Sequence, residues 1–237
     1  MIGIFSKTVD SNLLEALGYS ALDFIIIDQE HGFSNNETLA NHIRALKGKH
    51  CKSIVRVKEL NHQEIGKAFD LDADGVQVPN ISSVEEAQKA IDAARFFPIG
   101  NRGVCRFVAS AEYGTKERKQ YFSDANKKLL ILQVEGKEGI ENINAILKLD
   151  GYDILFVGPY DLSQSLGVPG EVESPKVIDL CYKVLNEAKK YNKKVGIFAA
   201  NIALAKKMRE VGFEYIAYSV DFNIFIEACN AITEKIK

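Results

Sequence analysis

Two acidic residues, Glu135 and Asp161, have the types and the spacing that could hold a cation. Each follows a run of apolar residues, and about one strand–helix unit separates them, so neighbouring parallel strands would bring them side by side. Two carboxylates in that position repel each other unless a proton or a cation lies between them. Oxygen ligands that leave positions open for water and substrate suit Mg²⁺, Mn²⁺ or Co²⁺ better than a structural zinc. Alternatively, each acid forms an ion pair with an arginine or a lysine at the rim of the site.

A second polar group, formed by Asp28, Glu30 and His31, follows the apolar run Ile25–Ile27 directly. The run is typical of a strand buried on both faces, so the charged residues fall where that strand ends. A histidine beside carboxylates that orient it is a candidate general base, although a lone histidine is more often structural.

Two further polar residues, Arg56 and Gln133, also lie near the ends of apolar segments. An arginine there is a fixed cation that can bind a carboxylate or a developing enolate oxygen through two hydrogen bonds. It could also form an ion pair with Asp28 or Glu30, and the two roles can coexist. By strand alternation, Gln133 lies on the same face as Glu135 and could hydrogen-bond a ligand. The remaining histidines fall in a helical pattern or in polar loops and are expected to be solvated: His42, His50 and His62.

Several other chemistries lack their motifs. The chain has no GxGxxG or Walker loop, no GxSxG turn and no HExxH pair. A Schiff-base aldolase needs a lysine inside the site, whereas Lys58 and Lys137 lie in stretches typical of solvent-facing loops. The segments after the last two strands lack the glycine-rich backbone that cradles a phosphate, which favours an unphosphorylated substrate.

The elements that must position these residues are eight apolar runs that alternate with amphipathic stretches along the chain. The expected strands are 2–5, 24–28, 52–57, 75–80, 129–135, 154–159, 195–200 and 215–220. Helical patterns cover 82–97, where Ser83 and Glu86 form a capping box, 175–191, and 201–212, which ends in the candidate C-cap Gly212. Segment 100–128 is expected to hold an extended connection with an extra helix. The pattern predicts an α/β protein with a single (β/α)8 TIM barrel over residues 1–237, and an open doubly wound sheet is the alternative.

Composition narrows the class of protein. The chain has 237 residues, 46% of them hydrophobic, and a formal net charge of −2, which gives no indication of a nucleic-acid or membrane partner. Its four cysteines are far apart, as expected of reduced thiols in a cytoplasmic protein. We expect neither a signal peptide nor a membrane-spanning helix.

With these residues in view, the sequence resembles a known family. The segments IDQEHG, VRV, VQVPN, GNRGV, LLILQVE and FVGPYDLSQSLG occur in the order found in the HpcH/HpaI aldolase/citrate lyase family, whose 2,4-dihydroxyhept-2-ene-1,7-dioate aldolases are class II pyruvate aldolases. The similarity runs from about Gly3 to Asp221. It implies a TIM barrel of the phosphoenolpyruvate/pyruvate type that exchanges its C-terminal helix with a neighbouring subunit, giving dimers and possible hexamers.

The resemblance also implies an activity and its cofactor. The activity is a reversible retro-aldol cleavage of a 4-hydroxy-2-oxo acid to pyruvate and an aldehyde. A divalent metal would be the cofactor, with no organic cofactor, and Glu135 and Asp161 would hold it. Arg56 would stabilise the enolate oxygen, His31 would act in proton transfer, and Asp70, which local sequence marks only as a helix-end acid, would pair with His31.

Further residues are implied for the substrate pocket. Those that would contact substrate, besides Arg56, are Gln133, Gly158, Pro159, Tyr160, Asp161 and Phe198. Those expected at the pocket rim are Phe5, Asp28 and Glu30.

Departures from the family pattern concern the aldehyde. Gln29 replaces a glycine, Phe5 stands where a tryptophan is common, and Phe198 stands where a smaller aliphatic residue is common. Two other functions stay open at this point. One is a CoA-ester lyase of the citrate lyase β-subunit type, against which His31 argues. The other is a catalytically silent barrel that binds a keto acid or a metal.

Overall fold

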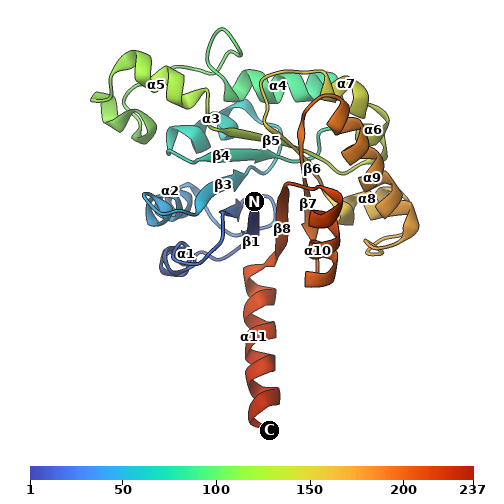
Figure 1. Cartoon of the computed structure of the whole chain (residues 1–237). Coiled ribbons are helices and arrows are strands. Elements are labelled where there is room, and N and C mark those ends of the chain that lie inside the picture. Colours follow the sequence, from blue (N-terminus) through green and yellow to red (C-terminus); the bar gives the residue numbers. More distant parts are fainter.

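The computed structural model describes residues 1–237 and shows eight parallel strands closed into a barrel with helices outside it (Figure 1). The strands are β1 (Ile2–Ser6), β2 (Phe24–Asp28), β3 (Lys52–Arg56), β4 (Gly75–Val78), β5 (Leu129–Val134), β6 (Ile154–Val157), β7 (Lys194–Ala199) and β8 (Tyr215–Val220). Because β1 pairs with β8 as well as with β2, the sheet has no edge, which excludes the open doubly wound alternative. The (β/α)8 prediction is confirmed.

The helices follow the strands in the expected alternation. They are α1 (Ser11–Leu17), α2 (Asn36–Leu46), α3 (His62–Asp70), α4 (Val84–Ala94), α5 (Arg118–Ala125), α6 (Lys137–Glu141), α7 (Ile143–Leu147), α8 (Pro159–Ser165), α9 (Pro175–Lys190), α10 (Ile202–Val211) and α11 (Asp221–Ile236). Segment 100–128 holds α5 and a short 3₁₀ helix over Ala109–Gly114, and no strand.

Local chemistry sets several of the boundaries. Strands β4 and β6 end earlier than expected, since each is followed by a proline that cannot donate to the ladder: Pro79 directly after β4, and Pro159, which instead opens α8. The Ser83 hydroxyl accepts from the Glu86 N–H at 3.2 Å, as an N-cap should. The Glu86 carboxylate reaches back to the N–H of Ser82, one residue before the predicted partner, at 2.8 Å. Gly212 ends α10 with a φ of 116°, as its C-cap role requires.

The core has two layers. The larger lies between the sheet and the helices and holds most of the buried Val, Ile, Leu and Ala side chains. The smaller fills the barrel itself with Phe and Ile side chains, where Phe24 stacks on Tyr215 with ring centroids 3.9 Å apart. Phe5 and Phe156 pack edge to face at 6.3 Å in this inner layer. The barrel is therefore a filled core, and the inner layer forms the floor of any site above it.

One predicted exposure is wrong. His42 is fully buried on α2, with Nε2 3.0 Å from the Thr8 carbonyl oxygen and Nδ1 2.9 Å from the Ser11 hydroxyl. Burial lowers the pKa of this histidine, which favours its neutral form. A buried neutral histidine with both ring nitrogens bonded is a structural clamp between α2 and the segment after β1. His50 and His62 are exposed, as expected.

The last helix, α11, projects away from the barrel and has no neighbour along most of its length (Figure 1). Only Asp221, its first residue, is buried. Its exposed apolar side chains are Phe222, Phe225, Ile226, Ile232 and Ile236. No helix of the chain has both the length and the apolar character needed to cross a membrane.

Candidate active site

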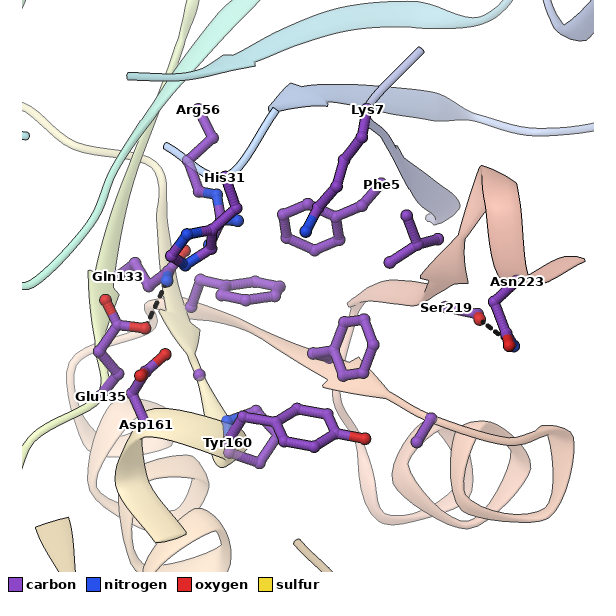
Figure 2. Close-up of a pocket in the computed structure, with 16 residues that line it drawn as sticks. Phe5, Lys7, His31, Arg56, Gln133, Glu135, Tyr160, Asp161, Ser219 and Asn223 are labelled. Atoms are coloured by element: carbon purple, nitrogen blue, oxygen red, sulfur yellow. Dashed lines mark hydrogen bonds between the residues drawn. The ribbon is translucent and has the colours of Figure 1, made fainter. Parts of the chain in front are cut away.

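A cavity of about 500 Å³ opens at the carboxyl ends of the strands, the end at which barrels of this kind carry their chemistry. Figure 2 shows Arg56, His31, Gln133, Glu135 and Asp161 gathered at one side of it. Five side chains from four segments of the chain thus meet as the sequence predicts.

Glu135 follows β5 and is 4% exposed. The Gln133 amide donates to its Oε2 at 2.5 Å, and the backbone N–H of Asn80 donates to its Oε1 at 2.8 Å. Asn80 adopts a φ of 57°, an uncommon conformation for a residue other than glycine. Burial raises the pKa of Glu135 to about 7, the two hydrogen bonds oppose that shift, and the nearby charges of Asp161 and Glu30 add to it. The carboxylate is thus held in place but lacks a counter-charge.

Gly158 makes room for this carboxylate. A Cβ atom at position 158 would overlap Oε2 of Glu135 and would lie 2.9 Å from its Cβ. Beyond Gly158, α8 begins with Pro159 and carries Asp161 in its first turn. Neither Glu135 nor Asp161 takes part in any ion pair of the chain, so the alternative in which each is neutralised by a rim arginine or lysine is wrong.

Arg56, at the end of β3, makes the ion pairs that the sequence left open. Its Nε and Nη2 donate to the two oxygens of Asp28 at 2.9 and 2.8 Å, and its Nη1 lies 2.9 Å from Glu30 Oε2. Burial raises the pKa of Glu30, and Arg56 partly offsets that shift. Asp28 Oδ1 also accepts from the backbone N–H groups of Glu30 and His31 at 3.1 and 3.3 Å. Asp28 therefore fixes both the guanidinium and the turn that carries His31.

Two predicted positions need correction. Asp28 is 1% exposed and lies beneath Arg56, because the β2–β3 register places Asp28 directly opposite Arg56, so it does not form the pocket rim. Glu30 is also absent from the lining of the cavity.

Asp70 does not meet His31 within the chain. It is the last residue of α3, which runs back against the strands, so it lies at the opposite end of the barrel from His31. There its carboxylate accepts from Arg102 at 2.5 Å.

The remaining predicted residues do line the cavity: Phe5, Gly158, Pro159, Tyr160 and Phe198. Phe198 packs against Phe5 with centroids 5.8 Å apart and against Tyr160 at 5.6 Å. These rings form an aromatic wall of the cavity, and Figure 2 shows two of them, Phe5 and Tyr160, beside the polar cluster.

Several lining residues escaped sequence reasoning, notably Lys7, Ser219 and Asn223. Lys7 follows β1, Ser219 lies near the end of β8, and Asn223 lies in the first turn of α11. The sequence could have indicated these residues, because their strands end at the same face as the others. Gln77 was harder to predict as part of the site: it is fully buried on β4 and donates to Gln133 Oε1.

The donor set suits a hard divalent cation. No three His, Cys, Asp or Glu side chains come together as a closed metal cluster, so the protein offers two carboxylates and leaves other positions for water and substrate. Counting Asp28, Glu30, Glu135 and Asp161 against Arg56 and Lys7, the acids exceed the bases by two charges. A divalent cation would balance that excess, and the room left by Gly158 for the Glu135 carboxylate fits such a ligand.

A closed parallel barrel with an acidic cavity at its carboxyl-end face is the architecture of TIM-barrel enzymes, and comparison with known proteins identifies the family. The sequence pattern of the HpcH/HpaI aldolase/citrate lyase family matches residues 1–228. The chain belongs to this family.

Individual proteins and structures are similar to this chain over most of its length. The chain is 32% identical over 229 residues to a 2-keto-3-deoxy-L-rhamnonate aldolase of Klebsiella pneumoniae, covering 96% of this chain and 85% of the relative. It is 32% identical over 237 residues to a 5-keto-4-deoxy-D-glucarate aldolase of an Enterobacter species, covering 100% and 92%. A crystal structure of an HpcH/HpaI aldolase/citrate lyase family protein from Burkholderia cenocepacia superposes with a TM-score of 0.94 at 30% identity, covering 100% and 94%.

Proposed function

We propose that the protein is a class II pyruvate aldolase, a carbon–carbon lyase that reversibly cleaves a 4-hydroxy-2-oxo acid to pyruvate and an aldehyde. The observation that carries the proposal is the buried Glu135 carboxylate beside Asp161, both without a basic partner, in a cavity that also presents Arg56 and His31. The two aldolase relatives support the reaction class.

Glu135 and Asp161 would hold the divalent metal, and Mg²⁺, Mn²⁺ and Co²⁺ all suit carboxylate and water ligands. Such a cation supplies Lewis-acid stabilisation of negative charge on a bound 2-oxo acid. Gln133 orients Glu135 through its 2.5 Å hydrogen bond, and Gln77 orients Gln133 in turn.

The other residues of the site have separate roles in the proposed reaction. Arg56, fixed by Asp28 and Glu30, stabilises the oxygen on which enolate charge develops. In the cleavage direction His31 removes the proton of the C4 hydroxyl, the C3–C4 bond breaks, and its electron pair passes into the enolate as the aldehyde leaves. Protonation of the enolate at C3 gives pyruvate. The aromatic wall of Phe5, Tyr160 and Phe198 lies beside these groups and would limit the access of water to them.

We also propose that the working form is a homo-oligomer built on dimers that exchange α11, with a hexamer as a further possible assembly. The exposed apolar side chains of a helix without neighbours support this arrangement. Since Asp70 and His31 lie at opposite ends of one barrel, a pair between them would have to form across subunits.

Among substrates, the absence of a glycine-rich phosphate cradle after β7 and β8 supports an unphosphorylated acid. The names of the relatives support a chain of the deoxy sugar acid type. The four cysteines are all free, which supports a cytoplasmic location.

A direct test measures pyruvate release from a panel of 4-hydroxy-2-oxo acids with Mg²⁺, Mn²⁺ or Co²⁺ added and after EDTA. We expect release that needs the metal, at least a hundredfold loss in Glu135→Gln, and full activity in the control Glu138→Gln, an exposed residue three positions on. Binding of acetyl-CoA with no pyruvate from any acid would favour the CoA-ester lyase instead.

A further inference from the structure

The turn after β4 contacts two separate groups of the site. Asn80, two residues beyond the end of β4, donates its backbone N–H to Glu135 Oε1 at 2.8 Å. Its side-chain amide donates to Glu30 Oε1 at 3.2 Å. Glu135 belongs to the proposed metal site, whereas Glu30 lies 2.9 Å from Nη1 of Arg56, the proposed stabiliser of the enolate oxygen. A residue that does not itself line the cavity therefore contacts one acid of each group.

The backbone conformation of Asn80 explains the contact with Glu135. With a φ of 57°, the turn directs two successive N–H groups to the end of β5. The N–H of Asn80 bonds to Glu135, and the N–H of Ile81 bonds to the Gln133 carbonyl oxygen at 2.9 Å. Glycine adopts this left-handed conformation without steric cost, and asparagine and aspartate are among the few other residues that adopt it readily. The turn alone would accept glycine, so the asparagine side chain can have a role of its own.

The side-chain amide of Asn80 makes the one hydrogen bond that the Glu30 carboxylate accepts. Glu30 Oε2 is buried 2.9 Å from Arg56 Nη1, but no hydrogen bond of favourable angle reaches that oxygen. Because a carboxylate oxygen can only accept, Asn80 must turn its NH₂ group towards Glu30. The Glu30 side chain is only 14% exposed. Without the amide, this carboxylate would lack a donor and would rotate towards water, away from the guanidinium.

We infer that Asn80 is a positioning residue that couples the two groups of the site. Its backbone N–H holds Glu135, and its side-chain amide holds Glu30 against Arg56. The inference rests on the proposed aldolase function and adds to it a residue outside the cavity. Loss of the amide alone should leave Glu135 in place and disturb only Arg56. The guanidinium would then keep Asp28 as its one fixed partner and would be less well aligned with developing negative charge.

Two variants and a matched control separate the side chain from the backbone. Asn80→Gly keeps the left-handed turn and its N–H but removes the amide. Asn80→Asp also tolerates the turn, but its carboxylate would face Glu30 and repel it. The control is Asn192→Gly, because Asn192 is an exposed asparagine with a φ of 53° that lies outside the cavity. It reports the effect of placing glycine at a left-handed position without any change in the site.

Exchange of the pyruvate methyl protons in D₂O with Mn²⁺ present measures the effect on the reaction. We expect kcat for exchange to fall roughly fivefold in Asn80→Gly, the effect of one hydrogen bond at a partly exposed position. Asn80→Asp should lose more, and Asn192→Gly should match the wild type. In a Glu30→Gln background, Asn80→Gly should cause a much smaller further loss, because Asn80 acts on Arg56 through the Glu30 carboxylate. Mn²⁺ affinity, measured by calorimetry, should be unchanged in Asn80→Gly, since the N–H to Glu135 remains.

Oxalate, a planar dianion with the shape of the pyruvate enolate, gives a readout without turnover. With Mn²⁺ bound, we expect oxalate to bind roughly fivefold more weakly to Asn80→Gly than to the wild type. Wild-type oxalate affinity in both Asn80 variants would overturn the inference, and so would an equal loss in Asn192→Gly or an undiminished loss in the Glu30→Gln background. Absence of exchange in the wild type with metal bound would remove the aldolase proposal instead, and the oxalate comparison would still decide the role of Asn80.

Discussion

At the scale of single residues, the site depends on holding negative charges together. Glu135 is buried beside Asp161 and Glu30, and the one nearby guanidinium is engaged by Asp28 and Glu30. Such an arrangement costs free energy in the absence of a cation, since neighbouring carboxylates repel each other. The same arrangement makes a divalent cation a favourable occupant.

Adding a methyl group at Gly158 should damage this site selectively. In Gly158→Ala the new Cβ overlaps the Glu135 carboxylate, which must then move away from Gln133 and Asn80. We expect Mn²⁺ affinity, measured by calorimetry, to fall at least tenfold, because a displaced ligand loses its orienting hydrogen bonds. Gly136→Ala is the control, since nothing lies within 4 Å of its added Cβ. Equal Mn²⁺ affinity in Gly158→Ala and wild type would contradict the assignment.

The raised pKa of Glu135 predicts opposite pH trends with and without metal. Its folded pKa of about 7 exceeds the usual value of 4.5, so its contribution to stability is full below about 4.5 and is lost as the pH rises through 7. In EDTA, the free energy of unfolding of the wild type should therefore fall relative to Glu135→Gln between pH 5 and 8, by on the order of 2–3 kcal/mol. Metal binds the ionised form, so its stabilising effect should grow over the same range. Urea titrations at each pH measure both, and parallel profiles for the two proteins would refute the prediction.

At the scale of elements, the ends of β1 and β8 are joined by one side chain. Asp221 accepts from two backbone N–H groups and one hydroxyl after β1. Its replacement leaves these donors buried and unpaired. In Asp221→Ala we expect a loss of about 2–3 kcal/mol in the free energy of unfolding. Asp150→Ala is the control, because that side chain is fully exposed. A loss of less than about 0.5 kcal/mol in urea titration, the range of ordinary surface substitutions, would show that Asp221 is not a clamp.

Within the single chain, helix α11 has no packing partner along most of its length. If it packs on a neighbouring subunit, a charge at its exposed apolar positions must weaken assembly. Phe225→Asp should shift the protein towards monomers in light scattering, whereas Asn230→Asp, a polar position on the same helix, should not. The same oligomer for Phe225→Asp as for the wild type would rule out the exchange of α11.

Most elements could be predicted because continuous apolar runs between amphipathic stretches leave few alternatives to parallel strands covered by helices. Glu135, Asp161, Arg56 and Gln133 followed, since the ends of parallel strands share one face. Lys7 and Ser219 also lie at the ends of parallel strands, so the same reasoning could have predicted them. The position of Asp70 and the burial of His42 depend on which end and which face of a helix packs inward, which charge and spacing alone do not reveal.

At the scale of the whole molecule, the barrel closes from β1 to β8, and we propose that residues 1–237 form one domain. Its filled interior supports the cavity from below, and the excess of acids above that floor favours binding of a cation. The chemistry proposed for pyruvate therefore depends on both the metal and the carboxylates that the barrel brings together.

The most direct measurement is exchange of the pyruvate methyl protons in D₂O, followed by NMR, because it needs no knowledge of the aldehyde. We predict exchange with Mg²⁺, Mn²⁺ or Co²⁺ present, its loss with EDTA, and its loss in Glu135→Ala. Absence of exchange while metal is demonstrably bound, or exchange that persists in EDTA and in Glu135→Ala, would contradict the proposed enolate chemistry.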